Sequence, residues 1–318
     1  MVGVGFVSMV GMLIDTYLIR GALAGLFFGT SAIFIRLMPG LSPESITFYR
    51  LLIAFFILAL TNLLLAGRVR PGWGRMSLSP SLLLGALLGV HILLFTWSVR
   101  LTSILNATIL VNTTPIWAMI MGYLLGRGLP GPLPVTGTFI AIGGVAVIAA
   151  AQATYSPGNL LGDILAVLAA VVWAAYLMAG GSALRGLGAL TFLPGIYGGA
   201  TLSALVMLLL AGVGLKPPVS DEFAPLIGIA LFPTALGHSL HFSSLVGLTP
   251  HRAATLALLE PVVATFLGVV LLGETPRTEF VLGAGLAALG IYLVVVGRDL
   301  RGGRAKAPAS SLSSSRKA

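Results

Sequence analysis

The chain contains no cysteine and carries few charged side chains. Of its 318 residues, 8% are charged and 57% are hydrophobic. The lack of cysteine excludes disulfides, iron–sulfur clusters, thiolate zinc sites and cysteine nucleophiles. Because a soluble globular protein has about 25% charged residues, this composition also excludes an ordinary soluble enzyme. An intrinsically disordered chain is excluded as well, since it would need low hydrophobicity and high charge.

The few charges lie in short clusters that long apolar stretches separate. Asp, Glu, Lys and Arg are all absent from residues 76–99, 101–126, 128–162, 164–184, 186–215, 223–251 and 280–297. A stretch of about 17–25 apolar residues crosses the hydrocarbon core of a bilayer. Since lipid offers no hydrogen bonds to the backbone, each crossing segment must be a helix. We therefore predict an all-α polytopic membrane protein.

Turn-forming residues divide the apolar stretches into ten predicted transmembrane helices. Pro-Gly pairs, such as those at residues 39–40 and 157–158, mark several of the boundaries. The predicted helices span residues 21–37, 44–66, 81–99, 103–125, 133–151, 160–181, 189–211, 224–246, 252–273 and 279–297. Residues 1–19 are expected to form an N-terminal segment, and residues 298–318 a disordered basic tail that ends in a serine-rich run.

Basic residues are distributed unequally between the two sides of this predicted topology. Ten crossings place both termini on one side, which holds 13 of the 18 basic residues, whereas the other side holds four. The remaining one, Arg50, lies inside a predicted span. Because cytoplasmic loops are enriched in Lys and Arg, both termini are predicted to be cytoplasmic. The net charge of +9 is therefore an orientation signal, and we expect no nucleic-acid partner.

The two halves of the chain resemble each other when the sequence is shifted by 146 residues. Pro115 then aligns with Pro261. The aligned glycine pairs are Gly122 with Gly268, Gly137 with Gly283 and Gly144 with Gly290. A period of this length indicates a duplicated domain rather than a solenoid. Because each half holds five spans, the second copy would cross the membrane in the opposite orientation, as in many secondary transporters.

Short motifs occur in the same order in both halves. Those of the second half are Leu258-Leu259-Glu260-Pro261, Val270-Leu271-Leu272-Gly273-Glu274, Gly283-Ala284-Gly285 and Gly290. Those of the first half are Arg50 in the second span, Asn112-Thr113-Thr114-Pro115 and the glycines from Gly137 to Gly144. Both halves resemble the EamA domain of the drug/metabolite transporter superfamily. One departure from the resemblance is Arg127, which stands where the second half has the acidic Glu274.

The resemblance implies an inverted-repeat carrier with five helices in each half. The first EamA-like repeat would cover residues 20–152 and the second residues 159–297. Such carriers commonly export amino acids or other small metabolites across the plasma membrane. The partners implied are therefore a small-molecule substrate and the lipid bilayer, and a homodimer is a further option.

Two charged residues lie deep inside predicted spans, where an ionisable group costs roughly 2.5–3.5 kcal/mol. Arg50 could capture a carboxylate or phosphate of the substrate, or it could be a structural arginine bonded to helix carbonyls. Glu260 precedes Pro261, which frees a backbone carbonyl at a helix kink. Its carboxyl could exchange protons or hold a substrate amine, or it could be a neutral group bonded to a neighbouring helix.

Histidine, aromatic and amide side chains complete the candidate substrate site. His238 and His241 are three residues apart, hence on one helix face, and His91 lies near the middle of the third span. They could relay protons, line a cavity or simply be packed and hydrogen-bonded, and we expect no metal site. The other candidates are Trp97, Asn112, Trp173 and Tyr176. Trp173 and Tyr176 have the spacing of a stacking wall for a flat substrate, although helix packing explains most such aromatics.

The function that these features favour is secondary transport by alternating access, with an intramembrane enzyme or a channel as the alternatives. The sequence contains no Gly-x-x-x-x-Gly-Lys-[Ser/Thr] nucleotide-binding loop, so this chain does not drive transport with ATP through that motif. It also contains no Gly-x-Ser-x-Gly and no His-Glu-x-x-His motif, which weighs against an enzyme. We expect no cofactor, and proton coupling is the candidate energy source.

Overall fold

The computed structural model describes residues 16–64, 78–150, 160–183, 189–272 and 278–297, and all regular structure within them is helical. Eight helical segments of this part are long and apolar enough to cross a membrane, and a shorter apolar helix covers Pro132–Ile148. The prediction of an all-helical, multi-pass membrane protein is confirmed. The predicted tail at 298–318 lies outside the described residues.

The first half contains α2 (Thr16–Phe28), α3 (Ser31–Arg36), α4 (Pro43–Leu64), α5 (Leu78–Leu101), α6 (Ile104–Val111), α7 (Thr114–Leu124) and α8 (Pro132–Ala150). The second half contains α9 (Leu160–Ala183), α10 (Ala189–Leu210), α11 (Ser220–Ile229), the π-helix η2 (Ala230–His238), α12 (Ser239–Ser244), α13 (Pro250–Leu256), α14 (Leu259–Leu272) and α15 (Thr278–Val296). Within the described residues, the first helix is already present at Thr16, five residues before the predicted start.

Three spans that were predicted as single helices are interrupted. The breaks lie between α2 and α3, between α6 and α7 at residues 112–113, and between α13 and α14 at residues 257–258. The last two breaks precede Pro115 and Pro261, which are the prolines that the 146-residue shift aligns. A proline cannot donate its backbone hydrogen bond to the carbonyl four residues earlier, so the helix opens one turn before it.

The predicted helix at 224–246 is continuous but irregular. Its central turns form the π-helix η2, which contains Pro233. The Thr234 hydroxyl donates to the Ile229 carbonyl oxygen, five residues earlier, at 2.6 Å. π-helical turns are rare, and they are frequently found at functional sites.

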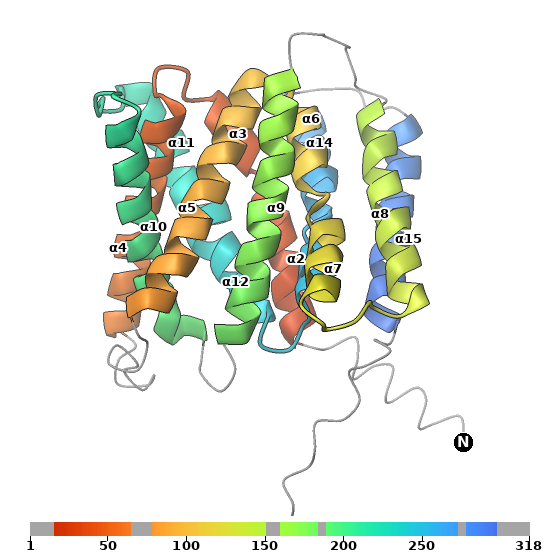
Figure 1. Ribbon diagram of the computed structural model, residues 1–318. Helices are drawn as coiled ribbons and strands as arrows, with labels where there is room; N and C mark the ends of the chain where they lie inside the picture. The colour runs from red at the N-terminus through yellow and green to blue at the C-terminus, as the bar shows by residue number, and fades with distance from the viewer. Residues whose placement is uncertain (1–15, 65–77, 151–159, 184–188, 273–277, 298–318) are drawn as a thin grey trace, which may run out of the picture.

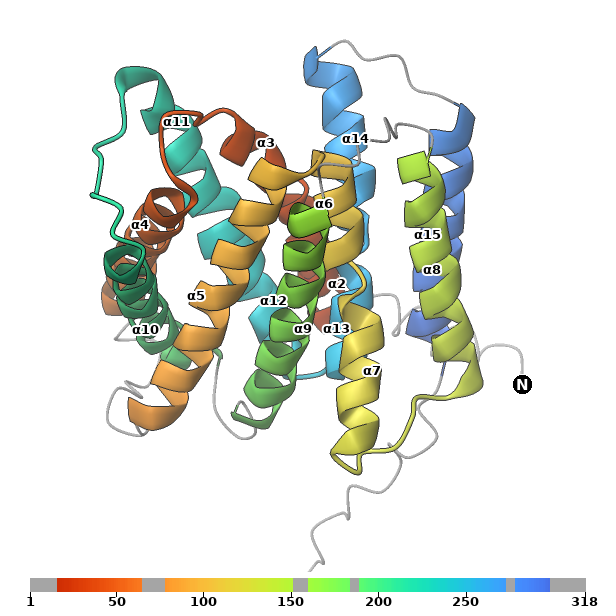
Figure 2. The same ribbon diagram turned by 45° about the horizontal axis from the view of Figure 1, so that its top comes forward.

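The helices form one bundle in which helices of the two halves pack against each other. Figures 1 and 2 show α8 and α15 side by side at one edge of the bundle. They approach so closely that a Cβ atom on Gly144 would lie 2.5 Å from the Ala287 nitrogen, and one on Gly290 2.3 Å from the Ala141 nitrogen. Elsewhere α5 packs against α9 and α10, and η2 packs against α2 and α4.

The bundle has two ends, which differ in the helices that begin and end there. We call the end where α3 ends and α4 and α11 begin the Met38 end, and the opposite end, where α2 begins and α7 ends, the Thr16 end. In Figure 1 the Met38 end is at the top and the Thr16 end at the bottom.

Candidate functional site

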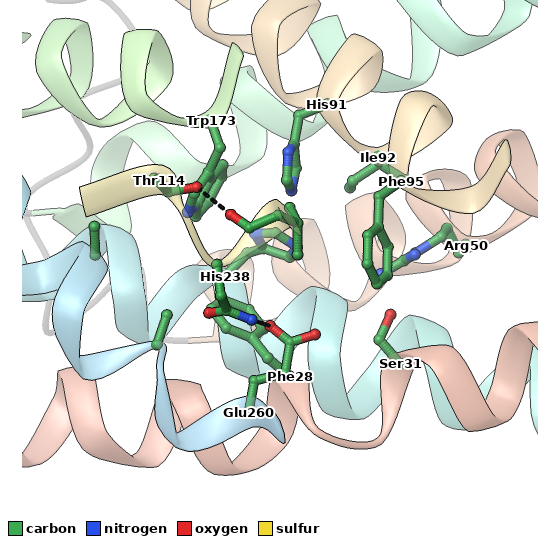
Figure 3. A pocket seen from close by; sticks show the side chains of 14 residues that line it. Phe28, Ser31, Arg50, His91, Ile92, Phe95, Thr114, Trp173, His238 and Glu260 are labelled. Carbon is green, nitrogen blue, oxygen red and sulfur yellow. Dashed lines mark hydrogen bonds between the residues drawn. The ribbon is translucent and has the colours of Figure 1, made fainter. Parts of the chain in front are cut away.

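A cavity lies in the middle of the bundle, where the helix breaks and η2 meet. Its lining comes from both halves of the chain: Phe28, Ser31, Arg50, His91, Ile92, Phe95, Val111, Asn112, Thr114, Trp173, His238, Ala254, Ala257 and Glu260. Figure 3 shows these side chains converging from several helices. The cavity volume is about 40 Å³, which is room for a few water molecules, since one water needs about 10–15 Å³.

Arg50 supplies the positive charge of this central cavity. Its side chain is 1% exposed, and its Nε donates to the Thr234 hydroxyl at 2.9 Å. Its Nη1 is buried without a hydrogen-bond partner. Within the described part of the chain, no carboxylate forms an ion pair with Arg50. Burying a positive charge is costly unless a negative charge pairs with it. An anion in the cavity would therefore be stabilised by the guanidinium.

Glu260 supplies the negative charge, and the helix breaks place it in the cavity. It lies in the first turn of α14, directly after one break, and Asn112 lies in the other. The Asn112 side-chain nitrogen donates to Glu260 Oε2 at 3.3 Å and to the Thr108 carbonyl oxygen at 2.7 Å. Asn112 therefore holds the carboxyl against the cavity. In Figure 3 Arg50 and Glu260 approach the cavity from two different sides.

An aromatic and imidazole wall lines the cavity beside these two charges. The His91 ring stacks on Trp173 with centroids 4.6 Å apart, and His238 meets Trp173 edge-on at 4.8 Å. His91 Nδ1 lies 3.0 Å from the Ala169 carbonyl oxygen. Because that carbonyl can only accept, Nδ1 carries a proton, and a neutral His91 presents Nε2 as an acceptor.

Six of the nine predicted site residues therefore line one cavity, and three do not. Tyr176 is fully buried behind Trp173, on which it stacks at 4.8 Å. His241 is also fully buried, and its ring lies 5.3 Å from that of Trp173. The third, Trp97, lies toward the Met38 end, where its indole nitrogen donates to Glu44 Oε1 at 2.9 Å.

Several residues of this region were not among the predicted site residues, and they include Phe28, Ser31, Phe95 and Thr234. Phe28 and Ser31 flank the break between α2 and α3, at a Gly29-Thr30 pair that interrupts an apolar run. Thr234 directly follows Pro233, in the middle of a predicted span. A mid-span proline beside a polar residue was the available signal, as it was for Glu260.

No metal site is evident in the described residues. Although His91, His238 and Glu260 line the same cavity, no group of three or more His, Asp or Glu side chains in that part of the chain is placed to hold a metal ion.

At the Met38 end, hydrogen bonds join the connection between α3 and α4 to other helices. The Gly40 N–H donates to Glu222 Oε1 at 2.8 Å, which joins this connection to α11 of the second half. Arg100 Nη2, at the end of α5, donates to the carbonyl oxygens of Met38 and Leu41. Glu222 is 3% exposed, so the first of these bonds is shielded from water.

The Thr16 end contains a second cavity of about 460 Å³. It is bounded by the last turns of α7 and α9, the connection at 245–249 and the start of α13. It reaches the surface, since Arg127, Leu129 and Val246 of its lining are exposed.

The two cavities lie in line along α7. Thr114 lines the central cavity, whereas Ala118 and Gly122 line the one at the Thr16 end. These residues are four apart, hence on one face of the helix, and one turn corresponds to about 5 Å. Along α7, the linings of the two cavities are therefore about one helical turn apart.

Comparison with known proteins identifies the family. The profile of the EamA-like transporter family matches residues 16–150 and 160–296. An uncharacterized transporter of Archaeoglobus fulgidus is 25% identical over 278 residues, which is 86% of this chain and 94% of the relative. The uncharacterized transporter YcbK of Bacillus subtilis is 25% identical over 173 residues, 52% of this chain and 51% of YcbK.

The fold also matches a solved structure. A crystal structure with 20% sequence identity superposes with a TM-score of 0.72 over 88% of this chain and 96% of that one. Together with the two matched repeats, which cover most of the sequence, this places the helices described above in a known architecture. The chain belongs to the EamA-like transporter family.

Proposed function

We propose that this membrane transporter is a secondary carrier that moves an amino acid or a related small zwitterionic metabolite by alternating access. The observation that carries the proposal is the central cavity, where Arg50 and Glu260 face one buried space without forming an ion pair with each other. A molecule with a carboxylate at one end and an ammonium at the other complements both charges. Arg50 would hold the carboxylate and Glu260 the ammonium.

The remaining lining fits the same class of substrate. The guanidinium fork suits a planar carboxylate, and the Trp173 and His91 rings offer a flat surface for an apolar side chain. The central cavity is smaller than a metabolite in this conformation, so binding requires the halves to separate by some ångströms. Glu260 is also the group that could exchange a proton in place of the substrate amine, which would couple transport to a proton gradient.

The proposal includes ten spans in two inverted halves of five helices. The packing supports this division, because the contacts come in matched pairs. Helix α5 packs on α9 and α10, while its counterpart α11–η2–α12 packs on α2 and α4. Likewise α7 packs on α9, and α14 packs on α2. The pairs α4–α10 and α8–α15 join corresponding elements of the two halves, and the pair α7–α13 joins the two interrupted spans.

The orientation follows from the basic residues. Arg127 and Arg252 lie at the Thr16 end, whereas Arg36 and Arg100 lie at the Met38 end. In the topology predicted from the sequence, the side that holds both termini carries 13 basic residues and the other side carries four. We infer that the Thr16 end is cytoplasmic, with both termini on that side of the plasma membrane. The larger cavity then opens to the cytoplasm, where a substrate for export would enter.

Proteoliposomes containing the purified protein test this function. L-amino acids are first ranked by thermal stabilisation, and counterflow of the best-ranked one is then measured. Saturable counterflow supports a carrier, non-saturable flux supports a channel, and chemical conversion of the substrate supports an enzyme. Stabilisation by none of the amino acids would contradict the proposed substrate class.

The role of Glu260 is tested in the same system. We expect Glu260→Gln to abolish transport driven by a pH gradient, because the amide cannot release a proton. The matched control is Glu279→Gln, which changes an exposed carboxylate at the start of α15. Intact proton-driven transport in Glu260→Gln would remove Glu260 from the mechanism.

A further inference from the structure

The widened turn η2 brings one hydroxyl group to the cavity's arginine. Thr234 is fully buried and lies one residue after Pro233. Its hydroxyl donates its only proton to the Ile229 carbonyl oxygen at 2.6 Å. It must therefore accept, rather than donate, in its 2.9 Å bond with Arg50 Nε.

Thr234 is itself held in place by its backbone. The Tyr197 hydroxyl, on α10, donates to the Thr234 carbonyl oxygen at 2.6 Å. Thr234 thus joins η2, α4 and α10 through three buried hydrogen bonds. In an ordinary α-helical turn the Ile229 carbonyl oxygen would accept from the N–H of residue 233. Because Pro233 has no N–H, this oxygen is left to accept from the Thr234 hydroxyl.

The bond to Thr234 decides which edge of the guanidinium is available. A carboxylate can bind an arginine along the edge formed by Nε and one Nη, or along the edge formed by both Nη atoms. In this protein Nε is already occupied, whereas Nη1 is buried with no partner and the side chain lines the cavity. Only the edge with both Nη atoms is left for a ligand.

We propose that Thr234 is a specificity-determining positioning residue, which fixes Arg50 so that it binds a carboxylate through its two Nη atoms. This inference rests on the proposed function for the identity of the ligand, but not for the contact itself. A carboxylate accepts two parallel hydrogen bonds from that edge, whereas a carboxamide offers one acceptor oxygen and a clashing NH2 group. Thr234 therefore makes the cavity select acids over amides.

The first test compares two substitutions that differ by one functional group. Thr234→Val removes the hydroxyl and keeps the shape of the side chain, whereas Thr234→Ser keeps the hydroxyl. The best-ranked L-amino acid and its α-carboxamide are each titrated by thermal stabilisation. We expect Thr234→Val to lose about tenfold of the preference for the acid, as the loss of one hydrogen bond to a charged group predicts. Thr234→Ser should keep it.

A structural role alone gives a different pattern. If Thr234 only stabilises the fold, Thr234→Val weakens the binding of the acid and of the amide equally, and the preference stays as in the wild type. That result would overturn the inference. Tyr197→Phe provides an intermediate case, because it removes the bond to the Thr234 backbone and leaves the hydroxyl in contact with Arg50.

A second measurement does not depend on the substrate. The unfolding temperatures of Arg50→Met, Thr234→Val and the double variant form a cycle with the wild type. If Thr234 acts through Arg50, Thr234→Val lowers the unfolding temperature much less in the Arg50→Met background than in the wild type. If Thr234→Val lowered the unfolding temperature equally in both backgrounds, Thr234 would not act through Arg50, and the inference would be wrong. Should no amino acid bind the wild type, the proposed substrate class fails and this cycle alone decides the role of Thr234.

Discussion

The two ends of the bundle differ in how the halves of the chain meet. At the Met38 end, Gly40 of the first half donates to the buried Glu222 of the second, and Arg100 binds the carbonyls of the same connection. At the Thr16 end, the corresponding space between the halves is a cavity of about 460 Å³ that reaches the surface. The central cavity therefore lies between an end where hydrogen bonds join the two halves and an end where a larger cavity reaches the surface.

Under the proposed alternating access, this difference between the two ends would correspond to one state of the transport cycle. A carrier must expose its site to one side at a time, so one end should be closed by contacts that can be released. At the Met38 end, the contacts that join the two halves are a few polar ones. Such contacts can be broken at a moderate cost, because hydrogen bonds to a carboxylate contribute about 1.5–3 kcal/mol each. If the protein works by the alternating access and in the orientation proposed above, this conformation would be accessible from the cytoplasm.

The largest effect on stability is expected at the contact between α8 and α15, where the backbones of the two halves pack directly against each other. The α8–α15 contact runs between both ends, and a Cβ on Gly144 would lie 2.5 Å from backbone atoms of Gly283 and Ala287. We expect Gly144→Ala to lower stability by about 2–4 kcal/mol, because backbone atoms cannot move aside as a side chain can. Thermal unfolding in detergent measures it.

The neighbouring glycine provides the control for this prediction. A Cβ on Gly143 would meet nothing within 4 Å, so Gly143→Ala should be neutral or slightly stabilising in the helix. Equal losses for the two variants would show that α8 and α15 are not fixed against each other. The α8–α15 pair could then not be regarded as the fixed part of the bundle that joins the two ends.

Thiol reactivity tests the comparison directly, because the chain has no native cysteine. Met119 lines the cavity at the Thr16 end, whereas Met38 is fully buried at the opposite end. We expect the thiol of Met119→Cys to react with a water-soluble maleimide about tenfold faster than that of Met38→Cys, since access limits the reaction. Leu129→Cys, at an exposed site, sets the upper rate. Equal rates for the two buried positions would contradict the assignment of open and closed ends.

The sequence predicted the parts of this fold that depend on local composition. The span predicted at 44–66 corresponds to α4 at Pro43–Leu64, and the depth of Arg50 follows from counting residues along it. The helix breaks were not predicted, because a proline such as Pro115 is compatible with a kink, a break or a helix start. Only packing against other helices selects among these outcomes.

For the candidate site, too, the sequence predicted what local polarity determines but not what the packing of distant helices determines. Arg50, Asn112 and Glu260 were predicted from polarity at membrane depth, and they share one cavity. Trp97 was predicted for the same reason, but it donates to Glu44 instead. Which helices are neighbours depends on the whole bundle, and η2 further changes the rotation between helical turns. Spacing along the chain therefore could not separate the residues that line the cavity from those behind it.

The smallest effect is expected from weakening a single hydrogen bond between the two halves at the Met38 end. Glu222 accepts from Gly40 with one carboxylate oxygen and from Val219 with the other, at 2.8 and 3.2 Å. Glu222→Gln keeps one acceptor oxygen and loses the charge, so about one charge-assisted bond is removed. We expect the thiol of Met38→Cys to react about fivefold faster in this background.

The adjacent Asp221 is the matched control for this last substitution. It is exposed, and its carboxylate accepts from the neighbouring Ser220 hydroxyl rather than from the first half of the chain. Asp221→Asn should leave the reactivity at position 38 unchanged, because it removes the same charge without removing a contact between the halves. If both variants raised the rate equally, the loss of negative charge would be the cause, and Glu222 would not be the residue that closes this end. If only Glu222→Gln raises it, the closed end is held by a releasable bond, as alternating access requires.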